Sequence, residues 1–295
     1  MYNRCVSKKY INEYKVGERL DKVLSTAFPD YSRSSLAKLI EDEFVTVNGT
    51  TKPVRYKLKK DDVLQVDFEP LQKEAPEITL PIIFEDDEVI VINKPAGVLT
   101  HSKGEYNKEA TVATFIRSML QGANIWMQSN RAGIVHRLDR ATSGVIISAK
   151  SKLTQDYLQG QFSKRNVKKT YIAVVVGKLS EDKGLIDVPI ERNPKKPATF
   201  KAGVNGKTAQ TYFEVISFNG KYSMVELKPI TGRTHQLRVH LNFLGHPIVG
   251  DTLYKGEIAP RLMLHALKLE LTLPNHQRTT FVAPLPSEFE GYQYS

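Results

Sequence analysis

The sequence predicts an α+β protein of two domains. Its 295 residues are enough for two folding units. Residues 14–68 combine amphipathic helical stretches with short alternating strands, and residues 82–292 are rich in strands. Between them, residues 69–81 carry three prolines and four charged residues with little periodicity, which predicts a linker.

The first domain is expected to be a small unit of helices and a hairpin, preceded by a weakly ordered leader over residues 1–13. Hydrophobic side chains at helical spacing and strong turn residues indicate its elements. They are a helix starting near Val16 and ending at Pro29, a helix over 33–42 capped by Ser32, a strand ending in the turn Asn48-Gly49, and a strand over 63–68.

The second domain alternates strands with a few helices. The expected elements are a hairpin with an acidic tip at 85–88, a helix capped by Thr111, a strand over 145–148, a helix over 152–162, a strand over 168–178, a hairpin over 209–230 turning at Asn219-Gly220, and a helix over 235–244 stopped by Gly245.

Composition favours a protein that meets a polyanion. The net charge is +10, and residues 91–295 hold 28 Lys and Arg against 15 Asp and Glu. Such an excess favours contact with phosphates, although a merely basic surface would look the same. No apolar run reaches the ~20 residues needed to cross a bilayer, and the polar start is unlike a signal peptide. The single cysteine, Cys5, suits a reducing cytoplasm.

The most unusual stretch is Gly133 to Lys150, in which a dense polar turn lies between strand-like segments. Asp139 is its sharpest candidate for chemistry, since a carboxylate beside a hydrophobic scaffold can act as a nucleophile, a general base or half of an ion pair. A loop salt bridge is the plain alternative for a single aspartate. A protein kinase is excluded, because its catalytic loop needs Asp directly after His-Arg and an Asn further on.

The string H-R-L-D-x-x-T-S-G in this stretch closely resembles the catalytic motif of the RluA-type pseudouridine synthases, which modify RNA. The resemblance makes Asp139 the catalytic aspartate. K-x-Y-x-A resembles the family's second motif, so Tyr171 is expected to stack on the base. G-R-T-H-Q-L-R-V-H resembles the third, and from it Arg233 is expected to pair with Asp139, while Arg238 and His240 support the motif or contact RNA.

Further substrate contacts follow from the same resemblance. Arg137 is expected to fill the space left by the flipped base. The motif N-K-P-A-G-V-L-T-H suggests Lys94 and His101 as residues that face RNA, with a structural loop role equally open. The other expected contacts are His136, Thr142, Lys169, Thr234 and Leu264. The implied fold is a mixed, mostly antiparallel central sheet with flanking helices.

Residues 14–68 resemble the S-four-type RNA-binding domain in their order of elements and in R-L-D-K, S-R-S-S-L and V-T-V-N-G. The phosphate-contact candidates that this implies are Arg19, Lys22, Arg33 and Lys38; solvated helix faces would explain each of them equally well. The chain departs from the family pattern at Glu43, where a glycine is usual. Since glycine there suggests a positive φ, the corner is expected to be rebuilt around Glu43.

The expected activity is isomerisation of specific uridines to pseudouridine in structured RNA after base flipping. Large-subunit ribosomal RNA is the expected substrate. The reaction is neutral in redox terms, and no nucleotide-binding or metal-ligand pattern occurs, so no cofactor or metal is expected. The alternatives are a transfer-RNA enzyme and an inactive RNA-binding protein of ribosome assembly; a metal-dependent nuclease is disfavoured. RNA is the only partner expected, and the sequence leaves the target uridine, the chemical route of Asp139 and the oligomeric state open.

Overall fold

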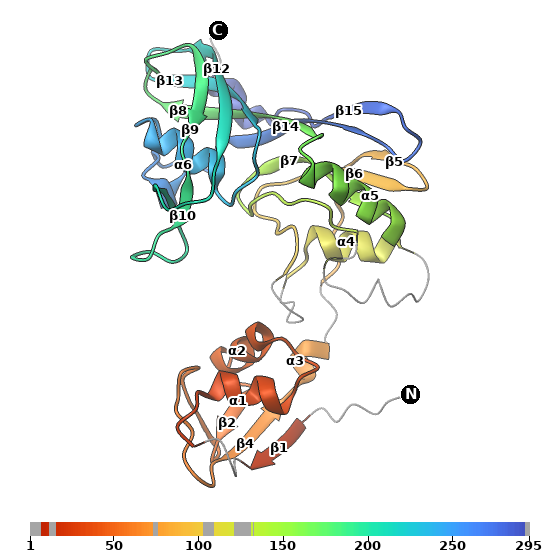
Figure 1. Cartoon of the computed structure of the whole chain (residues 1–295), viewed down its shortest axis with the longest axis vertical. Helices are drawn as coiled ribbons and strands as arrows, with labels where there is room; N and C mark the ends of the chain where they lie inside the picture. Colours follow the sequence, from red (N-terminus) through yellow and green to blue (C-terminus); the bar gives the residue numbers. More distant parts are fainter. Residues whose placement is uncertain are drawn as a thin grey trace. The chain divides into compact units, whose positions relative to one another are not determined.

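A computed structural model describes residues 7–11, 16–72, 76–102, 109–120, 131 and 133–292. The chain divides into two compact units, Met1–Ile78 with His101–Thr114, and Thr79–Thr100 with Phe115–Ser295 (Figure 1). Parts of the expected leader and linker, residues 1–6, 12–15 and 73–75, lie outside the described residues. Within the described part of the chain, no helix is long and apolar enough to cross a membrane.

The first unit packs two helices on a four-stranded sheet of order β1-β4-β2-β3. Its elements are β1 (Ser7–Ile11), α1 (Leu20–Ala27), α2 (Arg33–Glu41), β2 (Val45–Val47), β3 (Thr50–Thr51), β4 (Val63–Asp67) and α3 (Glu69–Gln72). The weakly ordered leader was a wrong expectation, because strand β1 pairs antiparallel with β4 within it. The short helix α3 lies at the start of the expected linker.

The corner after α2 keeps the backbone conformation that glycine favours. Glu43 has φ 67°, its N–H donates to the Ile40 carbonyl at 3.2 Å, and the next N–H, of Phe44, donates to the Leu39 carbonyl at 2.9 Å. These two bonds close the helix end in the manner of a Schellman motif. The sequence had suggested a rebuilt corner, and this expectation was wrong. Glu43 adopts the left-handed conformation itself.

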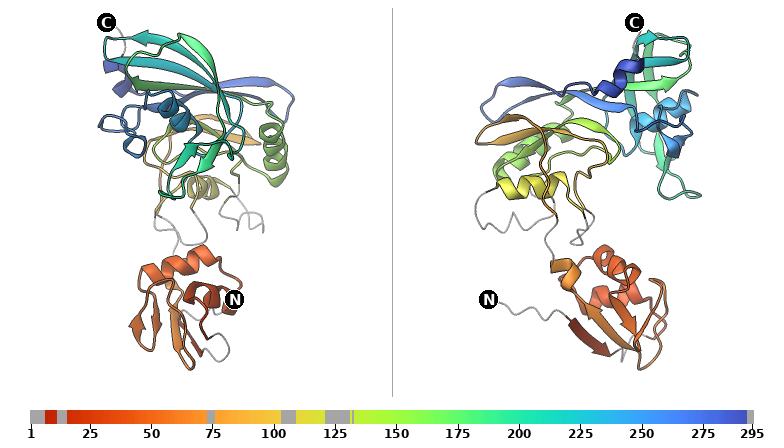
Figure 2. Two further views of the ribbon diagram at one scale, coloured as in Figure 1. Left: turned by 60° about the vertical axis from the view of Figure 1, so that its left-hand side comes forward. Right: turned by 180° about the vertical axis from the view of Figure 1, so that it is seen from behind.

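The second unit is built on a nine-stranded sheet, so the predicted mixed, mostly antiparallel architecture is confirmed (Figures 1 and 2). The order is β5-β6-β7-β14-β8-β13-β12-β9, with β15 also paired to β14. The strands are β5 (Ile82–Glu85), β6 (Val89–Lys94), β7 (Ser143–Ala149), β8 (Lys168–Val176), β9 (Lys183–Asp187), β12 (Gln210–Phe218), β13 (Tyr222–Pro229), β14 (Leu264–Thr272) and β15 (Arg278–Val282).

One parallel pairing joins the two halves of this sheet. It runs between β7 and β14, where His265 faces Ser143 and Ala266 faces Gly144; every other strand pair described in the sheet is antiparallel. Gly144 has φ 118°, and a Cβ atom there would collide with the backbone of Ala266. The seam between the halves thus depends on a residue without a side chain.

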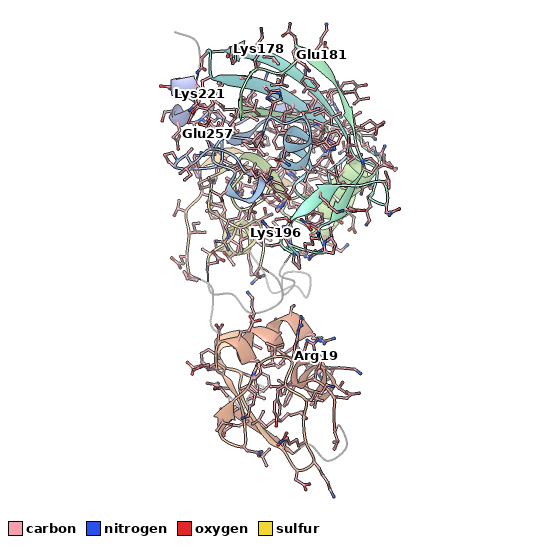
Figure 3. All side chains as sticks on the ribbon, turned by 90° about the vertical axis from the view of Figure 1, so that its left-hand side faces the viewer. Arg19, Lys178, Glu181, Lys196, Lys221 and Glu257 are labelled. Atoms are coloured by element: carbon pink, nitrogen blue, oxygen red, sulfur yellow. The ribbon has the colours of Figure 1, made fainter. Side chains whose placement is uncertain are left out.

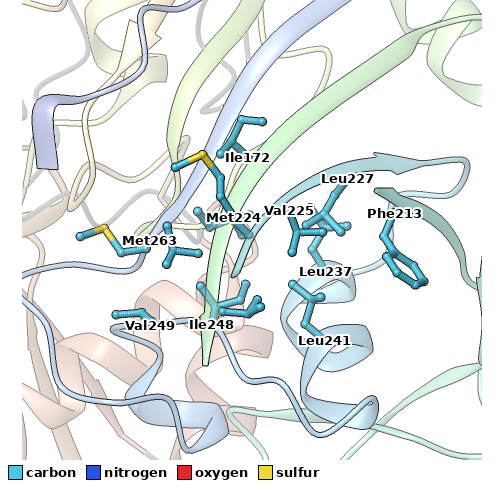
Figure 4. Close-up of a cluster of buried hydrophobic side chains, with 14 of the residues drawn as sticks. Ile172, Phe213, Met224, Val225, Leu227, Leu237, Leu241, Ile248, Val249 and Met263 are labelled. Carbon is cyan, nitrogen blue, oxygen red and sulfur yellow. The ribbon is translucent and has the colours of Figure 1, made fainter. Parts of the chain in front are cut away.

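Helices and small elements complete this unit. They are α5 (Lys152–Ser163), α6 (Gln236–Phe243), the two-stranded pair β10 (Ile190–Arg192) and β11 (Phe200–Ala202), and the short 3-10 helices η2 (Thr252–Tyr254) and η3 (Ser287–Tyr292). Helix α4 (Val112–Met119) begins in the first unit and ends in the second. Helix α6 buries Leu237 and Leu241 against Val225 and Leu227 of β13 (Figure 4). Because Leu237 and Leu241 face β13, other side chains of α6, such as Arg238, are free to line the pocket described below.

Candidate active site

The loop that carries Asp139 is held from behind by the Asn93–His101 segment. The Thr100 hydroxyl donates to the Leu138 carbonyl at 2.8 Å and accepts from the Leu138 N–H at 3.2 Å. The Gly97 N–H donates to the Arg140 carbonyl at 2.8 Å. These bonds to the backbone on both sides of Asp139 hold the loop from which its side chain projects.

Lys94 belongs to this support. Its side chain is fully buried, and its ammonium donates to the carbonyls of Pro95 at 2.9 Å, Val98 at 2.8 Å and Arg140 at 3.2 Å. Burial lowers the pKa of Lys94 to about 7, against the opposing attraction of the Asp139 charge. Of the two roles that the sequence left open, the structural loop role fits this lysine.

A pocket opens over Asp139 and gathers most of the residues that the sequence singled out. The predicted residues that line it are Arg137, Asp139, Thr142, Lys169, Tyr171, Arg233, Thr234 and Leu264. They come from the 136–142 loop, from β8, from the turn before α6 and from the start of β14. Segments from both halves of the sheet thus meet at one carboxylate.

The expected pairing of Arg233 with Asp139 was wrong. Nη1 of Arg238 lies 3.8 Å from the Asp139 carboxylate, whereas Nε of Arg233 donates to the Thr208 carbonyl at 3.1 Å. Arg238 is itself held by two bonds of 2.7 Å to the fully buried Asp251. A planar guanidinium can make this two-pronged contact and still present a third nitrogen to Asp139.

His235 is a second neighbour of Asp139 that the sequence analysis did not identify. Its Nε2 lies 3.9 Å from the Asp139 carboxylate, and its backbone is left-handed, with φ 58°, at the start of α6. Burial lowers the pKa of His235, against the attraction of Asp139. The ring is therefore neutral near pH 7. A bulky residue in this conformation is strained, and such strain gathers at functional sites.

Tyr254 selects the tautomer of His235. Its hydroxyl accepts from the Phe200 N–H at 2.9 Å and lies 2.9 Å from Nδ1 of His235. Among the residues that the structure describes, Nδ1 is the one acceptor within reach of that hydroxyl proton. With Nδ1 accepting, the neutral ring carries its proton on Nε2, directed towards Asp139.

Tyr171 and Lys169, two positions apart on β8, give the pocket its aromatic ring and an amine. Burial, with a further contribution from the Asp139 charge, raises the pKa of Tyr171, so the phenol stays protonated. Burial lowers the pKa of Lys169 to about 8. Its ammonium donates only to the Thr231 carbonyl, at 3.4 Å, among the described residues. The site therefore offers a ring for stacking and a cation for an incoming anion.

His136 lies outside the Asp139 pocket, and its ring is used in packing. It stacks on Phe162 with ring centroids 4.6 Å apart, and its Nε2 accepts from the Ile147 N–H at 3.0 Å. Burial lowers its pKa to about 3. The expected substrate contact is thus replaced by a structural role. His240, likewise buried, lies 3.0 Å from both the Thr211 hydroxyl and the Val188 carbonyl.

Two of the four phosphate-contact candidates of the first unit, Arg19 and Arg33, are arranged around one aspartate. The buried Asp21 accepts hydrogen bonds of 2.8 to 2.9 Å from both Arg19 and Arg33. Burial raises the pKa of Asp21, but these bonds outweigh it and the net pKa is lowered. The arginine side chains remain 40% and 50% exposed, so they form a fixed pair with an excess positive charge. Lys22 pairs with Glu18, and Lys38 lies in the last turn of α2.

The second unit gathers a carboxylate, a guanidinium and a protonated phenol at one small pocket, and the first unit carries fixed surface arginines. This combination is typical of an enzyme that modifies RNA. The sequence comparisons identify the kind. Residues 88–243 match the RNA pseudouridylate synthase family, and residues 18–64 match the S4 domain. The chain belongs to the RNA pseudouridylate synthase family and is an isomerase of uridine in RNA.

Similar proteins cover nearly the whole chain. The ribosomal large subunit pseudouridine synthase D of Nitrosomonas europaea is 36% identical over 290 residues, covering 92% of this chain and 82% of that protein. An uncharacterized RNA pseudouridine synthase of Bacillus subtilis is 36% identical, covering 95% and 94%. The solved structure of human RNA pseudouridylate synthase domain containing 1 is 30% identical with a TM-score of 0.58, covering 72% of this chain and 86% of that one.

Proposed function

We propose that this enzyme converts particular uridines of large-subunit ribosomal RNA to pseudouridine, with Asp139 as the catalytic residue and Arg238 as its charge partner. The observation that supports the residue assignment is the meeting of Asp139, Tyr171 and Leu264 in one pocket with Arg238 3.8 Å from the carboxylate. The names of several relatives, including those of Nitrosomonas europaea and Vibrio parahaemolyticus, support the choice of RNA. A cytoplasmic location follows from that substrate.

The chemistry asked of the pocket is modest. The bond from ribose to the ring nitrogen breaks, the base turns, and a carbon–carbon bond forms in its place, with no change of oxidation state. The target base must first leave the helix, which costs a few kcal/mol. Arg137, exposed at the pocket rim, is positioned to enter the space that the base leaves. Tyr171 and Leu264 then offer apolar contact to the base.

Asp139 acts as an anion in each route open to it: attack on the ribose, attack on the base, or removal of a ribose proton. Arg238 and the Nε2–H of His235 face that anion. Because Asp251 already balances most of the Arg238 charge, the guanidinium can orient Asp139 without binding it rigidly. The carboxylate therefore keeps the freedom to engage the nucleotide.

The test is to map pseudouridines in ribosomal and transfer RNA from cells that lack the protein, and from the same cells restored with wild-type or Asp139→Ala protein. The expected result is loss of modification at specific uridines of large-subunit ribosomal RNA, restored by wild type alone, while purified Asp139→Ala still binds RNA. Loss at transfer RNA positions instead would overturn the substrate assignment. Restoration by Asp139→Ala would remove Asp139 from its role.

A further inference from the structure

A second cavity lies directly beside the Asp139 pocket. We call it the lateral groove; among its lining residues are Arg137, Phe162, Arg165, Lys169, Thr231 and Arg233. The two cavities share a wall, because Arg137, Lys169, Tyr171 and Arg233 line both. Whatever chain delivers a nucleotide into the Asp139 pocket has the lateral groove as a continuation of the same surface.

The charge of the lateral groove is of one sign. Four cations line it and no Asp or Glu does. Within the described part of the chain, none of the four side chains is ion-paired: Arg233 and Lys169 donate to backbone carbonyls, and Arg137 and Arg165 have no side-chain partner. Some other cations of this unit are neutralised, as where Lys221 lies 2.8 Å from Glu257 (Figure 3). Unneutralised cations in a groove favour an anionic ligand.

The backbone of Arg165 has a conformation that glycine adopts more easily. Arg165 follows the end of α5 with φ 59°; its N–H donates to the Phe162 carbonyl at 3.2 Å, and the next N–H, of Asn166, donates to the Gln161 carbonyl at 3.0 Å. This is a position where glycine is preferred and a long side chain is strained. The strain is retained at a residue whose side chain lines the lateral groove, which suggests a functional reason.

We propose that the lateral groove binds the phosphodiester backbone of the RNA next to the flipped uridine, with Arg165, Lys169 and Arg233 as its phosphate contacts. This site rests on the proposed function, since it presumes that the Asp139 pocket takes the uridine. The lining of the groove supports the assignment: Phe162 offers an apolar ring among the cations, which suits a sugar or base edge next to its phosphate. The lowered pKa of Lys169 also fits, because a phosphate would restore the charge that burial disfavours.

The test uses the full chain and two glycine variants with matched backbones. Arg165→Gly removes a groove cation and relieves a positive φ. Lys255→Gly also removes a cation and relieves a positive φ, here 64°, but this exposed lysine lines neither cavity. The probe is an in vitro transcript of large-subunit ribosomal RNA, and its Kd is measured at several salt concentrations. Urea unfolding of each variant is measured in parallel.

Both glycine variants should resist urea at least as well as wild type. Arg165→Gly alone should bind roughly five- to tenfold more weakly, with the slope of log Kd against log salt reduced by about 0.7, the value for one phosphate contact on a single strand. Arg165→Lys should recover most of the affinity. Wild-type affinity and slope in Arg165→Gly would overturn the proposal, and so would an equal loss in Lys255→Gly.

Failure of this inference is separable from failure of the proposed function. If wild type forms pseudouridine in the transcript while Arg165→Gly binds it as tightly as wild type, the groove proposal alone is wrong, and Arg165 serves the end of α5 instead. If wild type forms no pseudouridine in any ribosomal transcript, the substrate assignment fails whatever the affinities.

Discussion

Replacing Arg238 by lysine should slow the reaction far more than the same change at Arg233. The guanidinium of Arg238 lies 3.8 Å from Asp139 while it also holds Asp251 with two bonds. Two unit charges at about 4 Å interact by about 4 kcal/mol near a protein surface, which sets a ceiling of about a thousandfold in rate. A lysine has one point of contact and will stay with the fully buried Asp251. We therefore expect a decrease of about 100-fold for Arg238→Lys.

The assay is the single-turnover rate of pseudouridine formation in the RNA identified by mapping, at saturating enzyme. Arg233→Lys is the matched control: it keeps a cation that makes no ion pair within the described residues, so its rate should stay within about threefold of wild type. Urea unfolding of Asp251→Asn measures how much stability the same buried pair contributes. If Arg233→Lys loses the larger factor, the geometric reasoning is refuted.

Three further outcomes are expected. Glu43→Gly should stabilise the first unit by about 1 kcal/mol in urea unfolding, since it relieves a left-handed residue at φ 67°; a loss of stability would contradict the strain. Wild-type stability should rise between pH 7 and 10 relative to Lys94→Met, because the folded state, with a Lys94 pKa of about 7, binds fewer protons there than the unfolded chain, whose lysine has its ordinary pKa of 10.5; parallel pH curves would sink this. Tyr171→Phe should bind RNA normally but release product slowly, as followed by gel shift after turnover; wild-type release would limit Tyr171 to stacking.

The motifs predicted which segments meet at the site, but not which arginine meets the aspartate. Arg233 and Arg238 lie in one short motif, and the choice between them depends on where α6 begins. The helix starts at Gln236, after the left-handed His235, and both His235 and Arg238 come within 4 Å of the Asp139 carboxylate, at 3.9 and 3.8 Å. Both residues were present in the motif. The left-handed turn that precedes the helix is set by tertiary contacts, such as the Tyr254 bond.

The same limit explains the other differences. The fold class follows from the pattern of strands and helices, and the caps at Ser32 and Thr111 were predicted correctly because capping is local. Strand β1 was missed because its partner, β4, lies more than fifty residues later. His136 was expected at the substrate because the motif places it near Asp139, whereas its ring stacks on Phe162 of α5 and does not line the Asp139 pocket. Packing over long sequence separation decided each case.

The geometry of the active site depends on the short contact between β7 and β14. Asp139 approaches from the side of the sheet that ends in β7, and Tyr171 and Leu264 from the side that starts with β14. The relative position of Asp139 and Tyr171 depends on the close approach of the β7 and β14 backbones, which the missing side chain of Gly144 permits. A single methyl group, as in Gly144→Ala, would push the two strands apart. It would thereby shift Asp139 relative to Tyr171 in a pocket that Gly144 itself does not line.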